Sequence, residues 1–526
     1  MPNLPIPKPL PDDIDALKAM VRAQQAAMDQ MALVMASHAV EVEQLKLLIA
    51  KLQRMQFGRK SEKIDRQIAK LECRLEDLLA EEGVVDSLPL PPVVTPATGP
   101  ATEPKGPVRH ALPPELPREE RILEPAETAC PDCGGHLKPL GEDVSEQLEI
   151  LNTAFKVIRH IRRKKACACC DRIVQVPAAS RPILRGVAGP GLLAHILVAK
   201  FADHQPLYRQ SVIYARQGVE IDRSSMGRWV GACSALMAPL VDALRNHVMA
   251  GTKLHADDTT VSVLAAGHGQ TKTGRLWTYV RDDRSAASTV APAVWFAYTP
   301  DRKGIHPQTH LAGFHGILQA DAYAGFNAIY DTGQVREAAC WAHTRRKFHD
   351  LHVVHRTAFT TEVLRRIGEL YEIEEPLRGK PPDVRRQVRQ AQTLPLLVDF
   401  EAWLRARLPT LSAKSDTTKA INYALNQWQA LLLYCDHGIA EIDNNAAERA
   451  LRGVALGRKN FLFVGADSGG ERAAAMYALI GTAKLNGIDP EAYLRHVLTH
   501  IADYPINQIN DFLPWNVTEQ LGTASR

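Results

Sequence analysis

The stretch DNNAAERALR (443–452) follows two shorter motifs, LHADDTT (254–260) and LQADAY (318–323), and together they indicate the fold of the largest domain. They supply three carboxylates in chain order, Asp257, Asp321 and Glu448. The first two lie in or just after short apolar runs typical of strands, and the third lies on a predicted helix. Acids in this setting are typical of sites that hold two Mg²⁺ ions about 4 Å apart across a scissile phosphate. Because the chain has 59 Asp and Glu residues, the interpretation depends on what surrounds these three.

The first motif leaves open which of two neighbouring acids belongs to the site. Side chains alternate along a strand, so within 253–264 His255 and Asp257 share one face and Asp258 takes the other. Asp257 is therefore the preferred candidate, and Asp258 is the alternative. Asp321 ends a short apolar run, and ligands bind where such strands open into loops. For each acid taken singly, a structural role as a cap or turn residue is the competing interpretation.

The composition is that of a globular protein with several domains. With 526 residues, 45% of them hydrophobic and 23% charged, the chain can bury several cores, and its length suggests about three or four domains. The net charge of +4 does not indicate nucleic acid, but segment 156–185 holds nine Lys or Arg against one acid. No apolar run reaches the roughly 18–20 residues of a membrane span, and the N-terminus does not resemble a signal peptide. Nine cysteines, five within 130–170, favour a reduced, cytoplasmic location and a metal site.

Residues 12–83 are predicted to form a coiled-coil oligomerisation arm. Alternating steps of four and three residues from Leu17 to Leu52 give eleven positions, nine of them apolar, as expected of a coiled-coil seam. The alternative is an amphipathic helix that packs on the protein's own core. Residues 84–126 are rich in proline and are predicted to be an extended linker.

Residues 127–186 are predicted to form a zinc ribbon-like unit. Two cysteine pairs, each with a two-residue gap, lie 34 residues apart and suit a closed tetrahedral site for structural Zn²⁺. Cys169 makes the second pair ambiguous, and chance clustering of cysteines is the alternative. The predicted ligands are Cys130, Cys133, Cys167 and Cys170.

Between the two pairs, FKVIRHIRRKKA (155–166) alternates apolar and basic residues on a predicted strand. Such a strand can lay its basic side chains along DNA phosphates. A solvated face of the zinc unit is the alternative. The predicted contacts are Arg159, Arg162, Arg163, Lys164 and Lys165.

Residues 187–250 are predicted to form a helix-turn-helix-like domain. Helical stretches at 191–202, 206–217 and 222–232 are joined by short turns, with a break at Gly218. Asp222 is the expected N-cap of the recognition helix. An ordinary helical bundle that joins two domains is the alternative. Four residues are expected on the exposed face of the recognition helix, namely Arg223, Ser224, Ser225 and Arg228.

Residues 251–486 are predicted to form the catalytic domain, with a polar helical insertion at 351–436 and a helical tail at 487–526. Basic residues near the acids either hold phosphates or form a solvated face. They are Arg346 and Lys347 on a helix at 338–349, and Arg449, Arg452 and Lys459 beyond Glu448.

These motifs are similar, in content and order, to those of a known family. The chain resembles the insertion-sequence-66 (TnpC-type) DDE transposases over nearly its whole length. The matching motifs are the zipper-like helix with FGRKSEK (57–63), CPDCGG (130–135), LHADDT (254–259), TKTGRLWTYVRDDR (271–284), LQADAYAGFN (318–327) and DNNAAERALR (443–452). The position after the first Asp is usually Glu in this family and is Asp258 here, so the choice between Asp257 and Asp258 stays open.

The resemblance implies an RNase-H-like catalytic domain with Asp257, Asp321 and Glu448 as its acids. The expected architecture is thus a multidomain α/β protein with an N-terminal coiled coil, a zinc ribbon-like unit with four cysteine ligands, a helix-turn-helix and this interrupted catalytic domain. Elements of the family also encode two small accessory proteins, which are expected partners.

The expected function is DNA transposition with catalytic Mg²⁺ or Mn²⁺. The 3′ end of the element is cut, and the freed hydroxyl then attacks target DNA without a covalent protein intermediate. The zinc unit and helix-turn-helix are expected to bind the terminal inverted repeats, and the arm is expected to pair two ends in at least a dimer. A catalytically inactive DNA-binding repressor and a plain metal-dependent nuclease are the competing hypotheses.

Overall fold

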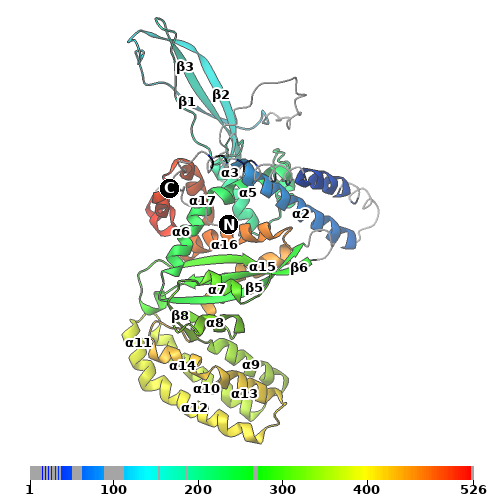
Figure 1. Cartoon of the computed structure of the whole chain (residues 1–526), viewed down its shortest axis with the longest axis vertical. Coiled ribbons are helices and arrows are strands. Elements are labelled where there is room, and N and C mark those ends of the chain that lie inside the picture. Colours follow the sequence, from blue (N-terminus) through cyan, green and yellow to red (C-terminus); the bar gives the residue numbers. More distant parts are fainter. Residues whose placement is uncertain are drawn as a thin grey trace.

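The computed structural model describes residues 37–49, 62–87, 112–151, 154–184, 186–264, 271–461 and 463–522, with a few isolated positions between 15 and 52. The molecule is elongated, with a β-ribbon at one end, an α/β body in the centre and a helical lobe at the other end (Figure 1). Most of the seam expected in 12–56 and of the linker expected in 84–126 lies outside the described residues. No helix of the described part has an apolar stretch long enough to cross a lipid bilayer.

A five-stranded mixed sheet forms the centre of the body. Its order is β7-β6-β5-β8-β9, with β5, β6 and β7 antiparallel and β5, β8 and β9 parallel. This order is consistent with the RNase-H-like domain that the resemblance implies. The strands are β5 (Lys253–Leu264), β6 (Thr271–Arg281), β7 (Ala293–Thr299), β8 (Gly316–Gln319) and β9 (Val335–Ala338).

Helices cover the two faces of this sheet. One face packs on α15 (Asn445–Asn460) and α16 (Asp467–Leu485), where Phe296 contacts Tyr477. On the other face Trp277 contacts His310 of α7 (Ile305–His310) and Phe326 of η2 (Ala324–Phe326), which α8 (Asn327–Tyr330) follows. Because side chains alternate along a strand, the odd-numbered residues of β5 from 255 to 263 face α15.

A group of helices joins the sheet to the β-ribbon. Its members are α3 (Pro190–Phe201), α4 (Leu207–Arg216), α5 (Arg223–Leu236) and α6 (Ala238–Met249). The C-terminal α17 (Pro490–His500) packs on α3, and its Tyr493, Leu494 and Val497 are fully buried. The C-terminal segment therefore shares one continuous core with α3 and the sheet.

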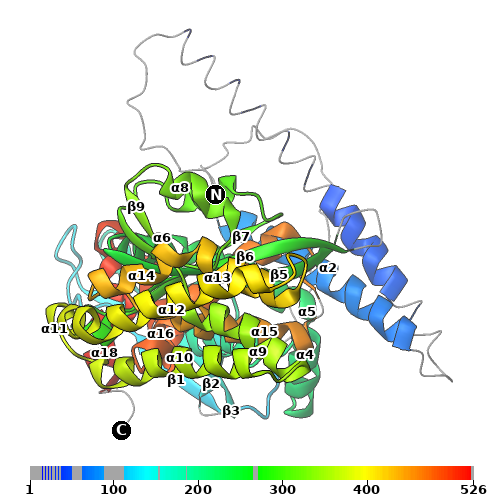
Figure 2. The same cartoon turned by 90° about the horizontal axis from the view of Figure 1, so that it is seen from below.

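The N-terminal arm lies against α5. Helix α2 (Glu62–Ser87) runs along it (Figure 2), and a Cβ atom on Gly231 would lie 1.8 Å from the carbonyl oxygen of Ala80. The helical residues 37–49 pack on α2 through Val42 and Ile49, two positions of the expected seam. These two positions are thus covered within one chain, and pairing of two chains along the seam stays a prediction.

The helical lobe lies between the second and third acids of the sequence and has its own core around Trp341, Phe400 and Trp428. A buried ion pair lies beside this core, because Nε and Nη2 of Arg389 donate to the two carboxylate oxygens of Glu374, at 2.6 and 2.7 Å. The lobe consists of α9 (Trp341–Val354), α10 (Ala358–Glu374), α11 (Pro382–Val388), α12 (Leu394–Arg407), α13 (Asp416–Asn426) and α14 (Trp428–Asp436).

The substitution Glu374→Gln is expected to destabilise the lobe by about 3–5 kcal/mol, because it leaves Arg389 buried without its charge partner. The matched control Glu401→Gln breaks a partly exposed i,i+4 pair with Arg405 and is expected to cost less than about 0.5 kcal/mol. Urea unfolding followed by tryptophan fluorescence measures both variants. Equal midpoints for the two would contradict the role given to the buried pair.

Candidate functional site

The three predicted acids come from three elements that meet beside the central strand. Asp257 lies in β5 and faces α15, Asp321 follows β8, and Glu448 lies in the first turn of α15. Strands β5 and β8 are parallel and pair His255 with Gln319, and Asp257 and Asp321 each follow this pair by two residues. The fold thus brings together acids from distant parts of the chain.

The charges of these acids act on one another. Burial raises the pKa of Asp257 to about 7, and the charges of Asp321, Asp258 and Glu448 act in the same direction. The backbone amide of Asp258, which donates to Asp257 Oδ1 at 2.7 Å, opposes this shift. A cation in the space between the acids would offset their repulsion.

The acids are spread more widely than the ligands of a single ion. Among the described residues, only the four predicted zinc ligands form a group of three or more metal-binding side chains whose ligand atoms all lie within 4.8 Å of one another.

Asp258 lies on the other face of β5 and is held there by two guanidinium groups. Arg275 lies 2.9 Å from Oδ2, and Arg302 donates to Oδ1 at 2.7 and 3.0 Å. The Asp258 side chain is only 2% exposed. Asp258 is thus engaged in structural ion pairs, whereas Asp257 faces the helix that carries Glu448.

Asn444, directly before α15, fixes this helix to β5. Its side-chain amide donates to the carbonyl of Ala256 at 2.8 Å, and its oxygen accepts from Nδ1 of His255 at 3.0 Å. Burial, followed by the charge of Lys253, lowers the pKa of His255 to about 3, so the ring is neutral. Both bonds reach residues just before Asp257. The sequence indicated that a helix starts here, but an Asn at such a position is usually a cap, and this side chain caps nothing.

Basic side chains approach the acids from two sides. His343 Nε2 and Arg346 Nη2 of α9 each lie 3.5 Å from Oε1 of Glu448. Arg302 Nη2 lies 3.8 Å from Asp321 Oδ2 and also holds Asp258. The sequence singled out Arg346, but Arg302 lies in a polar turn with no motif to mark it.

The other basic residues predicted near the acids are dispersed. Lys347 Nζ lies 5.3 Å from the centre of the Tyr423 ring. Arg449, Arg452 and Lys459 are exposed along α15. These side chains are accessible to DNA, and their contacts with phosphates stay a prediction.

The predicted zinc ligands meet at the tip of the β-ribbon. Cys170 Sγ lies 3.5 Å from Cys130 Sγ and 3.4 Å from Cys133 Sγ, and Cys133 Sγ lies 3.5 Å from Cys167 Sγ. These distances are close to the roughly 3.8 Å between thiolates on tetrahedral Zn²⁺. Backbone amides of Cys169 and Cys170 donate to Cys167 and lower its pKa to about 6. The Cys169 side chain is exposed and outside the group, so geometry favours Cys170.

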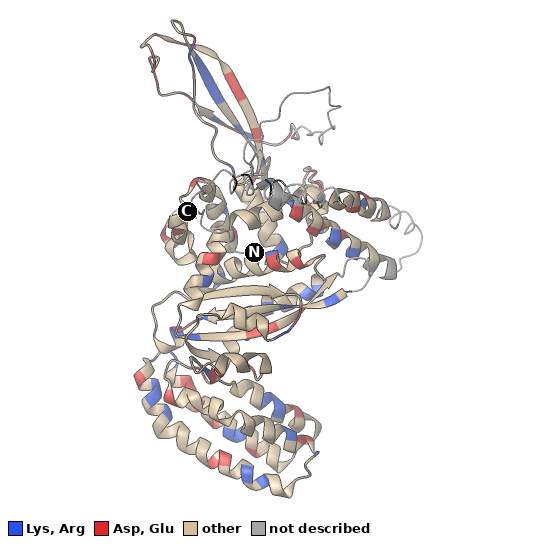
Figure 3. Cartoon of the chain, in the orientation of Figure 1, with Lys and Arg blue, Asp and Glu red and all other residues tan. Residues whose placement is uncertain are grey.

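The ribbon itself is a long antiparallel pair, β2 (Leu137–Leu151) and β3 (Ala154–Cys167), with β1 (Arg118–Leu123) and β4 (Ile173–Gln175) beside β3. Figure 3 shows basic and acidic residues side by side on its strands. Each basic residue of β3 that was predicted to contact DNA already has a partner on β1, on β2 or in the segment 124–127. These pairs are Arg159 with Glu120, Arg162 and Lys164 with Asp143, Arg163 with Glu124, and Lys165 with the carbonyl groups of Pro125 and Glu127.

The predicted helix-turn-helix is only partly matched by the structure. Helices α3, α4 and α5 occupy the expected stretches, and Gly218 has a φ of +80° in the turn between α4 and α5. Asp222 is at the N-cap of α5, but its side chain makes no capping bond. The expected exposed face differs. Arg223 is paired with Glu72 of α2 at 2.6 Å, and Ser224, Ser225 and Arg228 are only partly exposed, because α2 lies along this helix.

Most of the chain matches models of known protein families. Residues 185–472 match the model described as "Transposase IS66 family". Residues 127–171 match "zinc-finger binding domain of transposase IS66", and residues 478–515 match "IS66 C-terminal element". Residues 44–121 match "Transposase C of IS166 homeodomain".

Relatives of similar length point to the same family. The uncharacterized protein y4hP of Sinorhizobium fredii is 40% identical over 488 residues, covering 90% of this chain and 88% of that protein. The uncharacterized protein y4qI of the same organism is 36% identical over 540 residues, covering 96% of this chain and 97% of that protein. The chain therefore belongs to the IS66 family of DDE transposases, which are polynucleotidyl transferases.

Proposed function

We propose that this transposase cuts the 3′ ends of its own insertion sequence and joins them to target DNA, and that Asp257, Asp321 and Glu448 are its catalytic acids. One observation carries this proposal: these three acids, far apart in the chain, lie beside one strand and act on the pKa of Asp257. Asp258 is a weaker candidate because Arg275 and Arg302 occupy its oxygens.

The same acids are proposed to hold two Mg²⁺ or Mn²⁺ ions. Carboxylate oxygens suit these ions. The repulsion among the acids, which adds to the effect of burial in raising the pKa of Asp257, favours positive charge between them. When bound, such ions polarise the phosphate and offset the negative charge that develops on the attacking and leaving oxygens. The four cysteines are proposed to hold structural Zn²⁺.

Both reactions are displacements at phosphorus in which one P–O bond forms and one breaks. In the first, water attacks the phosphodiester at the end of the element and leaves a 3′-hydroxyl. In the second, that hydroxyl attacks a target phosphodiester and releases a new 3′-hydroxyl. Arg302 and Arg346, which lie beside Asp321 and Glu448, are proposed to orient the phosphate backbone in both steps.

DNA recognition is proposed to use surfaces outside the acid site. The β-ribbon and α5 are the proposed readers of the terminal inverted repeats. The ribbon pairs that involve Arg159 and Arg163 are partly exposed, and such pairs contribute little stability, so DNA phosphates compete for these cations at small cost. Pairing of two ends requires at least two chains, which we assign to the N-terminal arm, with the accessory proteins of the element as further partners.

The zinc assignment predicts different results for two neighbouring cysteines. Cys167→Ser is expected to lose bound zinc and to unfold the tip of the ribbon, because a structural ion supplies much of the folding free energy of a small unit. Cys169→Ser is the matched control and is expected to retain one zinc per chain. Metal analysis of the purified proteins measures both. Zinc loss in the control and retention in Cys167→Ser would reverse the ligand assignment.

The acid assignment predicts that Asp257→Asn and Asp321→Asn lower end cleavage by a factor on the order of 10³ while the protein still binds DNA. Asp258→Asn is the matched comparison and is expected to retain cleavage, with reduced thermal stability from its broken ion pairs. The assay uses labelled duplexes with the ends of the element and Mg²⁺ or Mn²⁺, and it scores both nicking and strand transfer.

The outcomes of this assay separate the competing functions. Binding without nicking, with the accessory proteins also present, would indicate a repressor. Nicking without strand-transfer products would indicate a nuclease. Loss of cleavage in Asp258→Asn but not in Asp257→Asn would move the first catalytic acid by one residue.

A further inference from the structure

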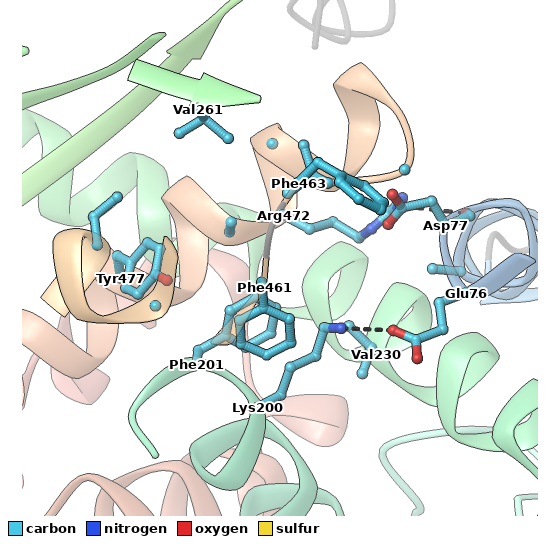
Figure 4. A pocket seen from close by; sticks show the side chains of 18 of the residues that line it. Glu76, Asp77, Lys200, Phe201, Val230, Val261, Phe461, Phe463, Arg472 and Tyr477 are labelled. Carbon is cyan, nitrogen blue, oxygen red and sulfur yellow. Dashed lines mark hydrogen bonds and ion pairs between the residues drawn. The ribbon is translucent and has the colours of Figure 1, made fainter. Parts of the chain in front are cut away.

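The acidic side of α2 contacts the body of the protein through three ion pairs, each with a cation from a different element. The pairs are Glu72 with Arg223 of α5 at 2.6 Å, Glu76 with Lys200 of α3 at 3.0 Å, and Asp77 with Arg472 of α16 at 3.2 Å. Figure 4 shows the last two at the pocket between α2 and the sheet. A fourth acid, Glu81, accepts a hydrogen bond from Ser468. We refer to Lys200, Arg223 and Arg472 as the α2-covered surface.

These three ion pairs contribute little to the free energy that holds the arm on the body, because burial removes the hydration of their charges. The side chains of Glu72, Glu76 and Arg472 are 9%, 8% and 8% exposed, so their ions lose most of their hydration. Glu76 Oε1 is shielded from solvent without a hydrogen-bond partner. Burial raises the pKa of Glu72, although Arg223 lowers it. Since well-packed apolar residues are often at least as stabilising as buried ion pairs, docking of the arm alone does not require these acids.

The acids of α2 match the phosphates of a DNA strand in number per unit length. Glu81 lies nine positions after Glu72, which is about 13.5 Å along a helix, and four acids on this span contact the body. A DNA strand presents one phosphate per roughly 3.4 Å of axis, or about four over the same length. Arg74 is the one basic residue between Glu72 and Glu82, and its partner is Glu41 on the segment 37–49, not an acid of the body.

We propose that the α2-covered surface binds the sugar-phosphate backbone of DNA, and that α2 occupies it in the free protein with its acids in the places of phosphates. This inference rests on the proposed function, because it assigns DNA as the competing occupant. It also accounts for Arg223, which the sequence placed on a DNA-reading helix and which the structure pairs with Glu72. Because Gly231 has no side chain, α2 packs closely on α5 at Ala80. The docked arm then excludes DNA from this surface.

The test neutralises the acids without changing their size. The triple variant Glu72→Gln/Glu76→Gln/Asp77→Asn is expected to bind a labelled duplex of arbitrary sequence roughly tenfold more tightly than the wild type at about 0.1 M salt. The slope of log affinity against log salt is expected to steepen by about two to three, because three cations gain phosphates. The matched control Glu43→Gln/Glu401→Gln/Asp416→Asn changes the net charge equally at acids that pair with other residues, and it is expected to show neither effect.

A second measurement covers the case in which the triple variant does not fold. Hydrogen exchange of α2 amides in the wild-type protein is expected to speed up when duplex DNA is added, because DNA displaces the arm. Unchanged exchange in the DNA complex would overturn the inference, as would a folded triple variant with unchanged affinity and salt slope. If neither the wild type nor the triple variant binds any duplex, including the ends of the element, the proposed function fails as well. If the wild type binds the ends but the triple variant gains no affinity for duplex DNA, the further inference fails and the proposed function stands.

Discussion

Two hydrogen bonds of the buried Asn444 side chain hold α15 on β5, and the relative position of Glu448 and Asp257 depends on them. A helix turns by about 100° per residue, so a shift of α15 by one residue would swing Glu448 away from the strand. Each bond contributes about 1 kcal/mol, but an unsatisfied amide at this depth costs more, and this penalty disfavours any other register. The low pKa of His255 keeps its ring neutral. The buried ring can therefore donate to the amide oxygen of Asn444 without a charge that would need a partner.

The segment before Asn444 is fixed by a second, charged network that reaches into the helical lobe. Glu441 pairs with Arg385 at 2.9 Å, and its backbone exchanges two hydrogen bonds with the Gln319 side chain of β8. Despite burial, which raises it, the charges of Lys253 and Arg385 keep the pKa of Glu441 below its ordinary value. Lys253 of β5 also lies 3.9 Å from Glu441. Glu441 therefore links the lobe, strands β5 and β8, and the segment that leads into α15. The lobe therefore supports the position of Glu448 and does not merely lengthen the loop before it.

What the sequence predicted depends on how local the controlling interactions are. The strands around Asp257 and Asp321, the paired cysteines and the break at Gly218 follow from spacing within a few residues, and the structure has strands, a cysteine cluster and a turn there. The pairing of Asp258 with Arg302 and of Arg223 with Glu72 joins residues far apart in the chain, and no local pattern encodes such contacts. For this reason the sequence was least able to predict whether a basic side chain is exposed or paired with an acid. The basic residues of β3 lie on a strand, as expected, but acidic partners lie on other strands, and their contacts with DNA stay a prediction.

Those partners change how this protein must bind DNA. Most cations near the proposed DNA surfaces are paired with carboxylates of the same chain, which agrees with a net charge of only +4. Binding then exchanges one anion for another, and the freed carboxylates attract cations from solution, which offsets part of the counterion release that normally favours association. Long-range attraction to any duplex is correspondingly weak, since the field of each cation is cancelled nearby. An arrangement that places several phosphates against several cations at once therefore matters more for DNA binding than the total charge of the protein.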